Sequence, residues 1–220
     1  IYVISGQQTG SAFGITTPSS SNDVYDPETD SWSKKASIPT PVVGYASAVL
    51  DNKIYIIGGG TAGGGPERNA TNQVQIFHPR TNVWTNGTPI PTGVAYASSC
   101  ATTGLFAPKR IYVTGGALMH NAGYASAVTI DLNQVYDPET GNWSIAASMP
   151  TPRYSSTLVN VDDELYAIGG NYHGDVLATD KYTPIGYIPE FPSWIVLPLF
   201  LTVTMVVAIY KKRLPKTSNN

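Results

Sequence analysis

The sequence predicts an all-β protein built from repeated four-stranded units, followed by one hydrophobic helix at the C-terminus. Three observations support this fold class: the composition, an internal repeat and an uncharged C-terminal segment. Only 13% of the 220 residues are charged, whereas glycine (21) and proline (17) are frequent. Such a composition favours short strands joined by turns over long solvated helices.

The first motif of the repeat is an apolar strand that ends in glycine, and its copies begin 53, 57 and 54 positions apart. Successive side chains of such a strand point to opposite faces, as a strand buried between two sheets requires. The glycines permit a positive φ and a close approach of two backbones. The copies are Ile1-Tyr-Val-Ile-Ser-Gly6, Ile54-Tyr-Ile-Ile-Gly-Gly59, Ile111-Tyr-Val-Thr-Gly-Gly116 and Leu165-Tyr-Ala-Ile-Gly-Gly170.

The second motif is a turn between two strands, followed by a tryptophan. Proline presets φ and aspartate bonds to its own backbone, which predicts a tight connection. The aromatic residues supply apolar area for packing between units. Asp51-Asn52 and Asp162-Asp163 predict similar turns between the first two strands of a unit. The copies are Val24-Tyr-Asp-Pro-Glu-Thr-Asp-Ser-Trp32, Ile76-Phe-His-Pro-Arg-Thr-Asn-Val-Trp84 and Val135-Tyr-Asp-Pro-Glu-Thr-Gly-Asn-Trp143, with a partial copy at Lys181-Tyr-Thr-Pro184.

The third motif connects one unit to the next, at Ile38-Pro-Thr-Pro41, Ile90-Pro-Thr92 and Met149-Pro-Thr-Pro-Arg153. Together the three motifs resemble the Kelch repeat over residues 1–184, which implies a Kelch-type β-propeller. We expect about three and a half four-stranded blades. Because propellers have about 4 to 8 blades, we also expect an N-terminal truncation. The expected pieces are strands two to four of a first blade to about Ser37, complete blades at about 42–88 and 94–147, and strands one to three of a last blade at about 153–183.

The C-terminal segment is predicted to cross a membrane. Residues 194–210 carry no charge, Trp194 and Tyr210 lie at its ends, and Lys211-Lys-Arg213 follows directly. Counted from Phe191, the stretch spans roughly 30 Å as a helix, which matches a hydrocarbon core. The positive-inside rule then places the tail in the cytoplasm and the propeller outside the cell, in a single-pass membrane protein. The predicted organisation is propeller 1–184, linker 185–193, transmembrane helix 194–210 and basic cytoplasmic tail 211–220.

A second resemblance concerns the same segment. Pro189-Glu-Phe-Pro192, the apolar stretch and the basic cluster are similar to archaeal C-terminal sorting signals of the Pro-Glu-Phe type. The resemblance implies a cell-surface protein whose anchor is either kept or replaced after cleavage, and both alternatives stay open.

Charge and cysteine content exclude some functions. Before the last ten residues the chain holds nine basic and fifteen acidic residues, and an acidic body repels phosphate backbones, so no nucleic-acid partner is expected. Cys100 is the only cysteine, so no intramolecular disulfide can form. We interpret it as a small buried side chain.

The predicted binding surface is one face of the propeller, where loops gather around the channel mouth. Candidate ligand-binding residues are Arg153, His120, Tyr124, Tyr172 and His173. Arg153 could bind a carboxylate of a ligand through two hydrogen bonds. The alternative role of Arg153 is a hydrogen bond between blades. The histidines could share a metal, but no Asp, Glu or Cys set completes the site, so solvated loop histidines are favoured. We expect no metal, cofactor or catalytic residue. The loops are about 7–22, 60–73, 117–131 and 171–178.

The function predicted is a membrane-anchored extracellular binding module for a glycan, a cell-surface polymer or a protein. The first alternative is a carbohydrate-active enzyme, because galactose oxidase and a sialic-acid epimerase share the Kelch architecture. No paired catalytic carboxylates, nucleophile elbow or phosphate loop accompanies the repeat, so an enzyme is not favoured. The second alternative is a structural component of a surface layer.

Overall fold

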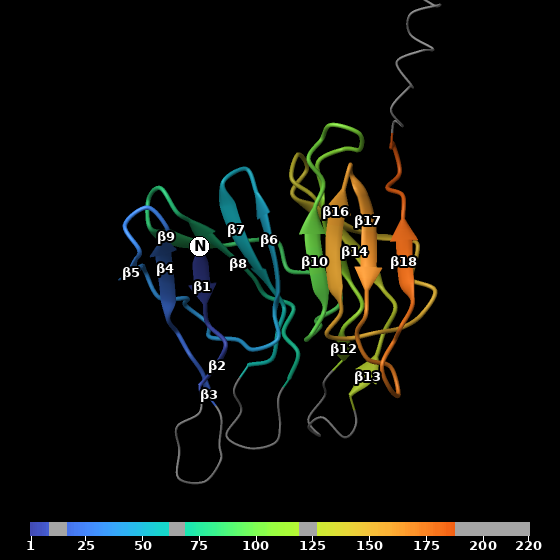
Figure 1. Cartoon of the computed structure of the whole chain (residues 1–220), viewed down its shortest axis with the longest axis horizontal. Coiled ribbons are helices and arrows are strands. Elements are labelled where there is room, and N and C mark those ends of the chain that lie inside the picture. Colours follow the sequence, from blue (N-terminus) through green and yellow to red (C-terminus); the bar gives the residue numbers. More distant parts are fainter. Residues whose placement is uncertain (9–16, 62–68, 119–126, 188–220) are drawn as a thin grey trace, which may run out of the picture. The chain divides into compact units, whose positions relative to one another are not determined.

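The structure is a computed structural model that describes residues 1–8, 17–61, 69–118 and 127–187. Within these ranges every regular element is a β-strand, and no helix there could cross a membrane. The segment predicted to span a membrane, residues 194–210, lies outside the described residues. Residues 1–187 form one compact unit (Figure 1), and its strands confirm the all-β part of the predicted fold class.

Among the described residues, the four large antiparallel sheets of the unit comprise two with four strands and two with three, and two further sheets have only two short strands each. Within each sheet the strands follow chain order, as in propeller blades. The prediction of about three and a half blades is therefore confirmed. The blades are β1 (Tyr2–Ile4), β4 (Asn22–Asp26) and β5 (Ser31–Lys34); β6 (Ala46–Leu50), β7 (Lys53–Ile57), β8 (Val74–His78) and β9 (Val83–Asn86); β10 (Ser98–Ala101), β11 (Ile111–Thr114), β14 (Asn133–Asp137) and β15 (Asn142–Ala146); β16 (Thr157–Val161), β17 (Glu164–Ile168) and β18 (Thr179–Tyr182).

The core lies between successive blades. In β6 the side chains alternate between buried and exposed, with Ala46, Ala48 and Leu50 turned inward. They pack with Ile111 and Val113 of the third blade in one hydrophobic cluster. Small residues on the first strands allow β10 to pack between β6 and β16 (Figure 1). Each blade therefore buries its apolar face against its neighbours.

The expected turns and tryptophan contacts are present. Asp51 and Asn52 have φ of 49° and 58°, the geometry of a two-residue hairpin turn. Trp84 packs on Phe77 with ring centroids 5.0 Å apart, and its indole N–H donates to Ala36 O of the preceding blade over 2.8 Å. The prediction that tryptophan packs blade on blade is confirmed here.

The loop between β10 and β11, residues 102–110, is longer than the two-residue turns of its neighbours and is held by one carboxylate. Asp163 lies in the turn between β16 and β17 and is 1% exposed. Its side chain accepts hydrogen bonds from Thr103 N, Leu105 N, Phe106 N and Ala107 N, at 2.5 to 3.1 Å. Asp163 therefore clasps the third blade to the fourth.

This clasp sets the protonation of Asp163. Burial alone would raise the pKa of the carboxyl group, but the backbone hydrogen bonds of Thr103, Phe106 and Ala107 outweigh it and hold the pKa well below its usual range. Because the folded-state pKa is depressed, the stabilisation is complete above the unfolded-state pKa of about 3.9 and is lost as the pH falls below it.

Replacing Asp163 with asparagine should lower the free energy of unfolding by about 2–4 kcal/mol at pH 7, because the buried amides lose a charged acceptor. The difference from the unmodified protein should shrink as the pH falls below about 4. Urea unfolding at several pH values measures both effects. Asp162→Asn, in the same turn but exposed, is the matched control. Equal losses for the two variants would contradict the clasp.

Candidate functional site

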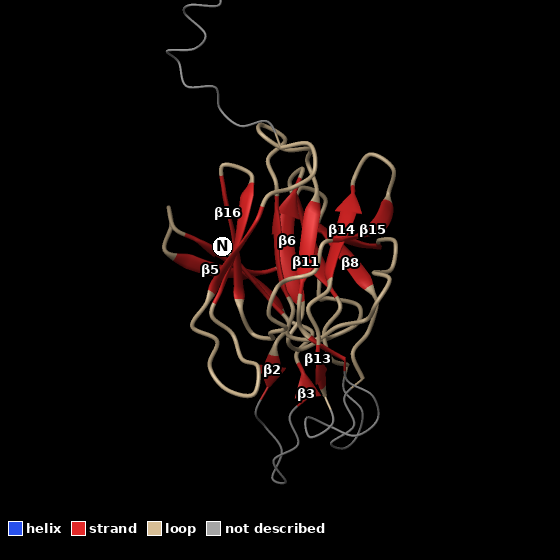
Figure 2. Ribbon diagram, turned by 90° about the vertical axis from the view of Figure 1, so that its right-hand side faces the viewer, coloured by secondary structure: helices blue, strands red, loops and turns tan. Residues whose placement is uncertain are grey.

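The loop face is the set of connections at one end of the sheets, at the bottom of Figure 1. It contains the links between the second and third strands of each blade. It also contains the crossing loops, by which we mean residues 38–45, 90–97 and 149–156, which lead into the next blade. Figure 2 shows two short ribbons at this end. They are β2 (Gln7–Gln8) with β3 (Thr17–Pro18), and β12 (Ala117–Leu118) with β13 (Val128–Thr129).

The crossing loops are joined to one another by backbone hydrogen bonds. Tyr96 N donates to Gly44 O over 2.5 Å, and Ser155 N donates to Tyr96 O over 2.8 Å. The three residues hold the same place in their loops, and their φ values lie between 52° and 59°. A positive φ is strained for tyrosine and serine, so the bonds hold a conformation that these residues rarely adopt. We call this chain of bonds the loop-face belt.

Each complete blade also holds its crossing loop through a glutamine of its third strand. Gln75 in β8 exchanges two hydrogen bonds of 2.8 Å with the backbone of Thr40. Gln134 in β14 binds the backbone of Thr92 in the same way, at 2.8 and 3.1 Å. A side-chain amide has both a donor and an acceptor, so it fixes the loop without introducing a charge.

The fourth blade replaces this amide clamp with an ion pair. Asp180 in β18 holds the position of the two glutamines, and its carboxylate accepts from the Arg153 guanidinium. The guanidinium also donates to Gly169 O and Ala178 O at 3.1 and 2.9 Å. Arg153 is fully buried, with 0% exposure. The geometry supports its structural role, and no part of the side chain reaches a surface where a ligand could contact it.

The structural role of Arg153 differs in one respect from the expected hydrogen bond between blades. The side-chain contacts described above, to Asp180, Gly169 O and Ala178 O, all lie within the fourth blade. The bond between blades is made by its backbone, because Gly116 N donates to Arg153 O over 2.8 Å. The arginine therefore orients the carbonyl group that the third blade uses.

Tyr172 and His173 lie in the link between β17 and β18, on the loop face. Tyr172 is 41% exposed, and its ring centroid lies 4.5 Å from that of His173. Leu177 in the same link is 95% exposed. We call Tyr172, His173 and Leu177 the link patch. His120 and Tyr124 lie outside the described residues, so their predicted meeting with the link patch stays a prediction.

Sequence reasoning missed the clamp residues, although the repeat contained a signal. The position just before the Val-Tyr motif of the third strand is polar in all four copies, even where the strand is buried. Buried polar side chains need hydrogen-bond partners, so this position could have been singled out. Its occupants are Asp23, Gln75, Gln134 and Asp180.

The described residues offer little chemistry beyond hydrogen bonding. Among them no group of three His, Cys, Asp or Glu side chains could hold a metal ion. Cys100 lies in β10 and packs against the core between the third and fourth blades. Burial raises the pKa of its thiol to about 12, so the nucleophilic thiolate is scarce at neutral pH. This supports the interpretation of Cys100 as a packing side chain.

Three features together define a Kelch-type β-propeller. The blades are antiparallel sheets in chain order, glycine pairs pack against the next crossing loop, and tryptophans lie between blades. Residues 1–180 match the KLHDC2/KLHL20/DRC7 Kelch-repeats domain. The chain therefore belongs to this Kelch-repeat family.

Curated relatives agree with the family. Beta-scruin of Limulus polyphemus is 29% identical over 204 residues, which cover 88% of this chain and 21% of the relative. Kelch-like protein 25 of Xenopus tropicalis is 32% identical over 178 residues, 78% of this chain and 27% of the relative. This chain thus spans only about a fifth to a quarter of their length. The solved structure of YjhT shares the fold, with a TM-score of 0.61, 19% identity and coverage of 83% of this chain and 66% of YjhT.

Replacing Arg153 with valine, the residue of the second and third blades at this position, should lower the free energy of unfolding by about 3 kcal/mol, because Asp180 loses its partner. Adding Asp180→Gln should restore most of the loss, since the amide can bind the backbone of Thr151 as its counterparts bind theirs. Urea unfolding followed by tryptophan fluorescence measures both variants. A double variant as unstable as Arg153→Val would show that the clamps are not equivalent.

Proposed function

We propose that this chain is a binding module that holds a protein partner on its loop face. The Kelch-repeat relatives support an interaction role, and the observation that carries the proposal is the exposed link patch on a loop face fixed by the belt. Leu177 is 95% exposed, and apolar and aromatic side chains at the surface are typical of protein interfaces. A glycan or another cell-surface polymer is the second ligand class, because tyrosine and histidine also suit polar ligands.

We further propose that the module stands outside a cell on a membrane anchor. Support comes from the uncharged residues 194–210, from Trp194 and Tyr210 at the ends of this segment, and from the basic residues after it. Binding is proposed over catalysis because the described part of the loop face presents exposed aromatic and apolar side chains, Tyr172 and Leu177.

Leu177→Asp should abolish binding through the loop face, because it adds a charge to the most exposed apolar side chain of the link patch. A library of random 12-residue peptides on phage, and a panel of immobilised glycans, are the probes. Leu105→Asp is the matched control, since Leu105 is 72% exposed. It belongs to the loop between β10 and β11, which lies at the end of the sheets opposite the loop face (Figure 1).

Selected peptides should bind the unmodified protein and Leu105→Asp equally, and Leu177→Asp at least tenfold more weakly, by biolayer interferometry. If the selected peptides bind Leu177→Asp normally and lose binding only to Leu105→Asp, the binding site lies at the other end of the blades. If the protein binds glycans and no peptides, its ligand belongs to the second class, a glycan or another cell-surface polymer.

Arginines at positions 200 and 203 should prevent membrane insertion, because each charge near the centre of the segment costs about 2.5–3.5 kcal/mol. The unmodified chain, expressed in cells, should sediment with membranes and resist extraction at high pH. The variant Phe200→Arg, Val203→Arg should leave the membrane fraction, whereas Thr217→Arg in the tail should have no effect. An unmodified chain that does not sediment with membranes would refute the anchor.

A further inference from the structure

The turn between the third and fourth strands carries opposite charges in different blades. In the first and third blades it begins with Asp-Pro-Glu, at Asp26 and at Asp137, whereas in the second blade it begins with His78-Pro-Arg80. An imidazole and a guanidinium thus replace two carboxylates. These turns lie at the end of the sheets opposite the loop face (Figure 1). The second blade therefore presents positive charge where its neighbours present negative charge.

In the third blade the carboxylate of this turn binds three groups. Asp137 accepts a hydrogen bond from the backbone N–H of Glu139 at 2.8 Å and a longer one from that of Thr140 at 3.4 Å. It also forms an ion pair of 3.1 Å with Arg110, which lies opposite it where the pairing of β11 with β14 continues. The carboxylate therefore holds the turn and neutralises the cation at the start of the second strand.

The second blade keeps the donors of this arrangement and lacks the acceptor. Lys53 is the counterpart of Arg110, and the register between β7 and β8 places it opposite His78. The ring of His78 cannot replace a carboxylate, and its Nε2 lies 2.9 Å from Thr85 Oγ1 of β9. Among the described residues, Lys53 forms no ion pair and the backbone N–H of Arg80 has no hydrogen-bond partner.

An open pocket of about 230 Å³ lies at this place and is lined by residues 51–53 and 78–81, which form the two hairpin turns of the second blade. Lys53 and Arg80 bring two positive charges to the lining. The carboxylate in the lining, that of Asp51, is already paired with Lys109 of the third blade at 2.7 Å. The pocket is therefore positive, on a chain that is acidic overall before its last ten residues.

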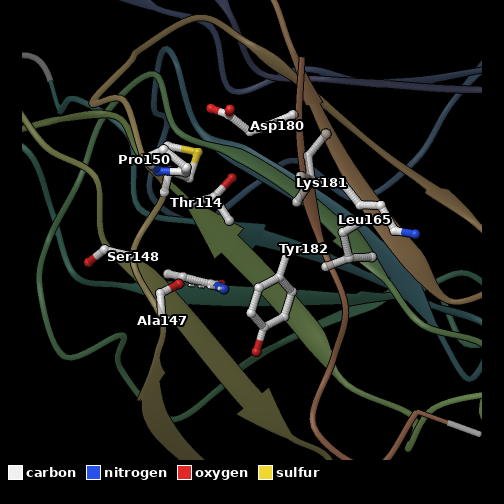
Figure 3. Close-up of a pocket in the computed structure, with 12 residues that line it drawn as sticks. Thr114, Ala147, Ser148, Pro150, Leu165, Asp180, Lys181 and Tyr182 are labelled. Atoms are coloured by element: carbon white, nitrogen blue, oxygen red, sulfur yellow. Dashed lines mark hydrogen bonds between the residues drawn. The ribbon is translucent and has the colours of Figure 1, made fainter. Parts of the chain in front are cut away.

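A different pocket, beside β18, is of another kind. Its lining includes Leu165 and Tyr182 (Figure 3), and it lies at the place that β9 and β15 take beside the third strand of the complete blades. That pocket is a place for a strand of the propeller itself. The positive pocket, in contrast, belongs to a complete four-stranded blade with a blade on each side.

We propose that the positive pocket of the second blade binds an acidic side chain of a protein partner, whose carboxylate takes the place of the missing aspartate. This carboxylate accepts from the backbone N–H of Arg80, as Asp137 accepts from the backbone of its own turn. It also pairs with Lys53, as Asp137 pairs with Arg110. A single exposed ion pair contributes little, so the expected ligand is a segment with several adjacent acidic residues. Its further carboxylates can pair with the guanidinium of Arg80, and the positive pocket attracts such a segment to this end of the blades.

Hexaglutamate labelled with fluorescein is the probe, hexaglutamine with the same label is its neutral counterpart, and fluorescence anisotropy with the full chain at low salt measures binding. His78→Asp should weaken the binding of hexaglutamate about tenfold, because the new carboxylate occupies the site and repels the ligand. Lys53→Gln should weaken it about fivefold. Lys34→Gln is the matched control and should have little effect, since it removes the same charge from an exposed position of the first blade.

Urea unfolding of His78→Asp should give a midpoint no lower than that of the unmodified protein, because Asp137 makes the same contacts in the third blade. If this variant is less stable, Lys53→Gln decides alone. Equal losses for Lys53→Gln and Lys34→Gln would overturn the proposal, because the probe would then respond only to net charge. Binding of polygalacturonate in place of hexaglutamate, or no binding of hexaglutamate at about 1 mM, would overturn it too. Leu177→Asp should leave hexaglutamate binding unchanged, so these outcomes are independent of the loop face.

Discussion

The arrangement of the blades depends on one backbone contact, in which the carbonyl group of a crossing loop accepts an amide N–H from the preceding blade. No side chain fits between the two backbones, because a Cβ on Gly58 or Gly115 would overlap the carbonyl oxygen of Val94 or Arg153. Glycine is therefore required by space as well as by its positive φ. The contacts are Gly6 N to Val42 O at 3.3 Å, Gly59 N to Val94 O at 2.8 Å and Gly116 N to Arg153 O at 2.8 Å.

Much of the fold could be predicted because its determinants are local. In the Asp-Pro turns, Asp26 accepts from Glu28 N at 2.9 Å and Asp137 accepts from Glu139 N at 2.8 Å. Both bonds join residues two positions apart, so a short motif contains the whole interaction. Repetition then multiplied the signal, since each motif occurs at least three times and errors in one copy are corrected by another.

The contacts that could not be predicted join residues far apart in the sequence. Arg153 binds Asp180, 27 positions away, and Asp163 binds the backbone of Thr103, 60 positions away. Neither pair follows the repeat. The arginine stands where other blades have valine, and the clasp exists only because one hairpin turn became a nine-residue loop. The sequence therefore predicted where the candidate surface lies better than which of its side chains are accessible, as the burial of Arg153 shows.

The loop-face belt has a thermodynamic consequence for any partner. Tyr96 and Ser155 have already given up backbone freedom in the unbound protein, because the bonds to Gly44 O and Tyr96 O hold them at positive φ. A partner at this face therefore loses little affinity to the ordering of the receptor. Differences in affinity among partners then arise mainly from how long each complex lasts rather than from how fast it forms.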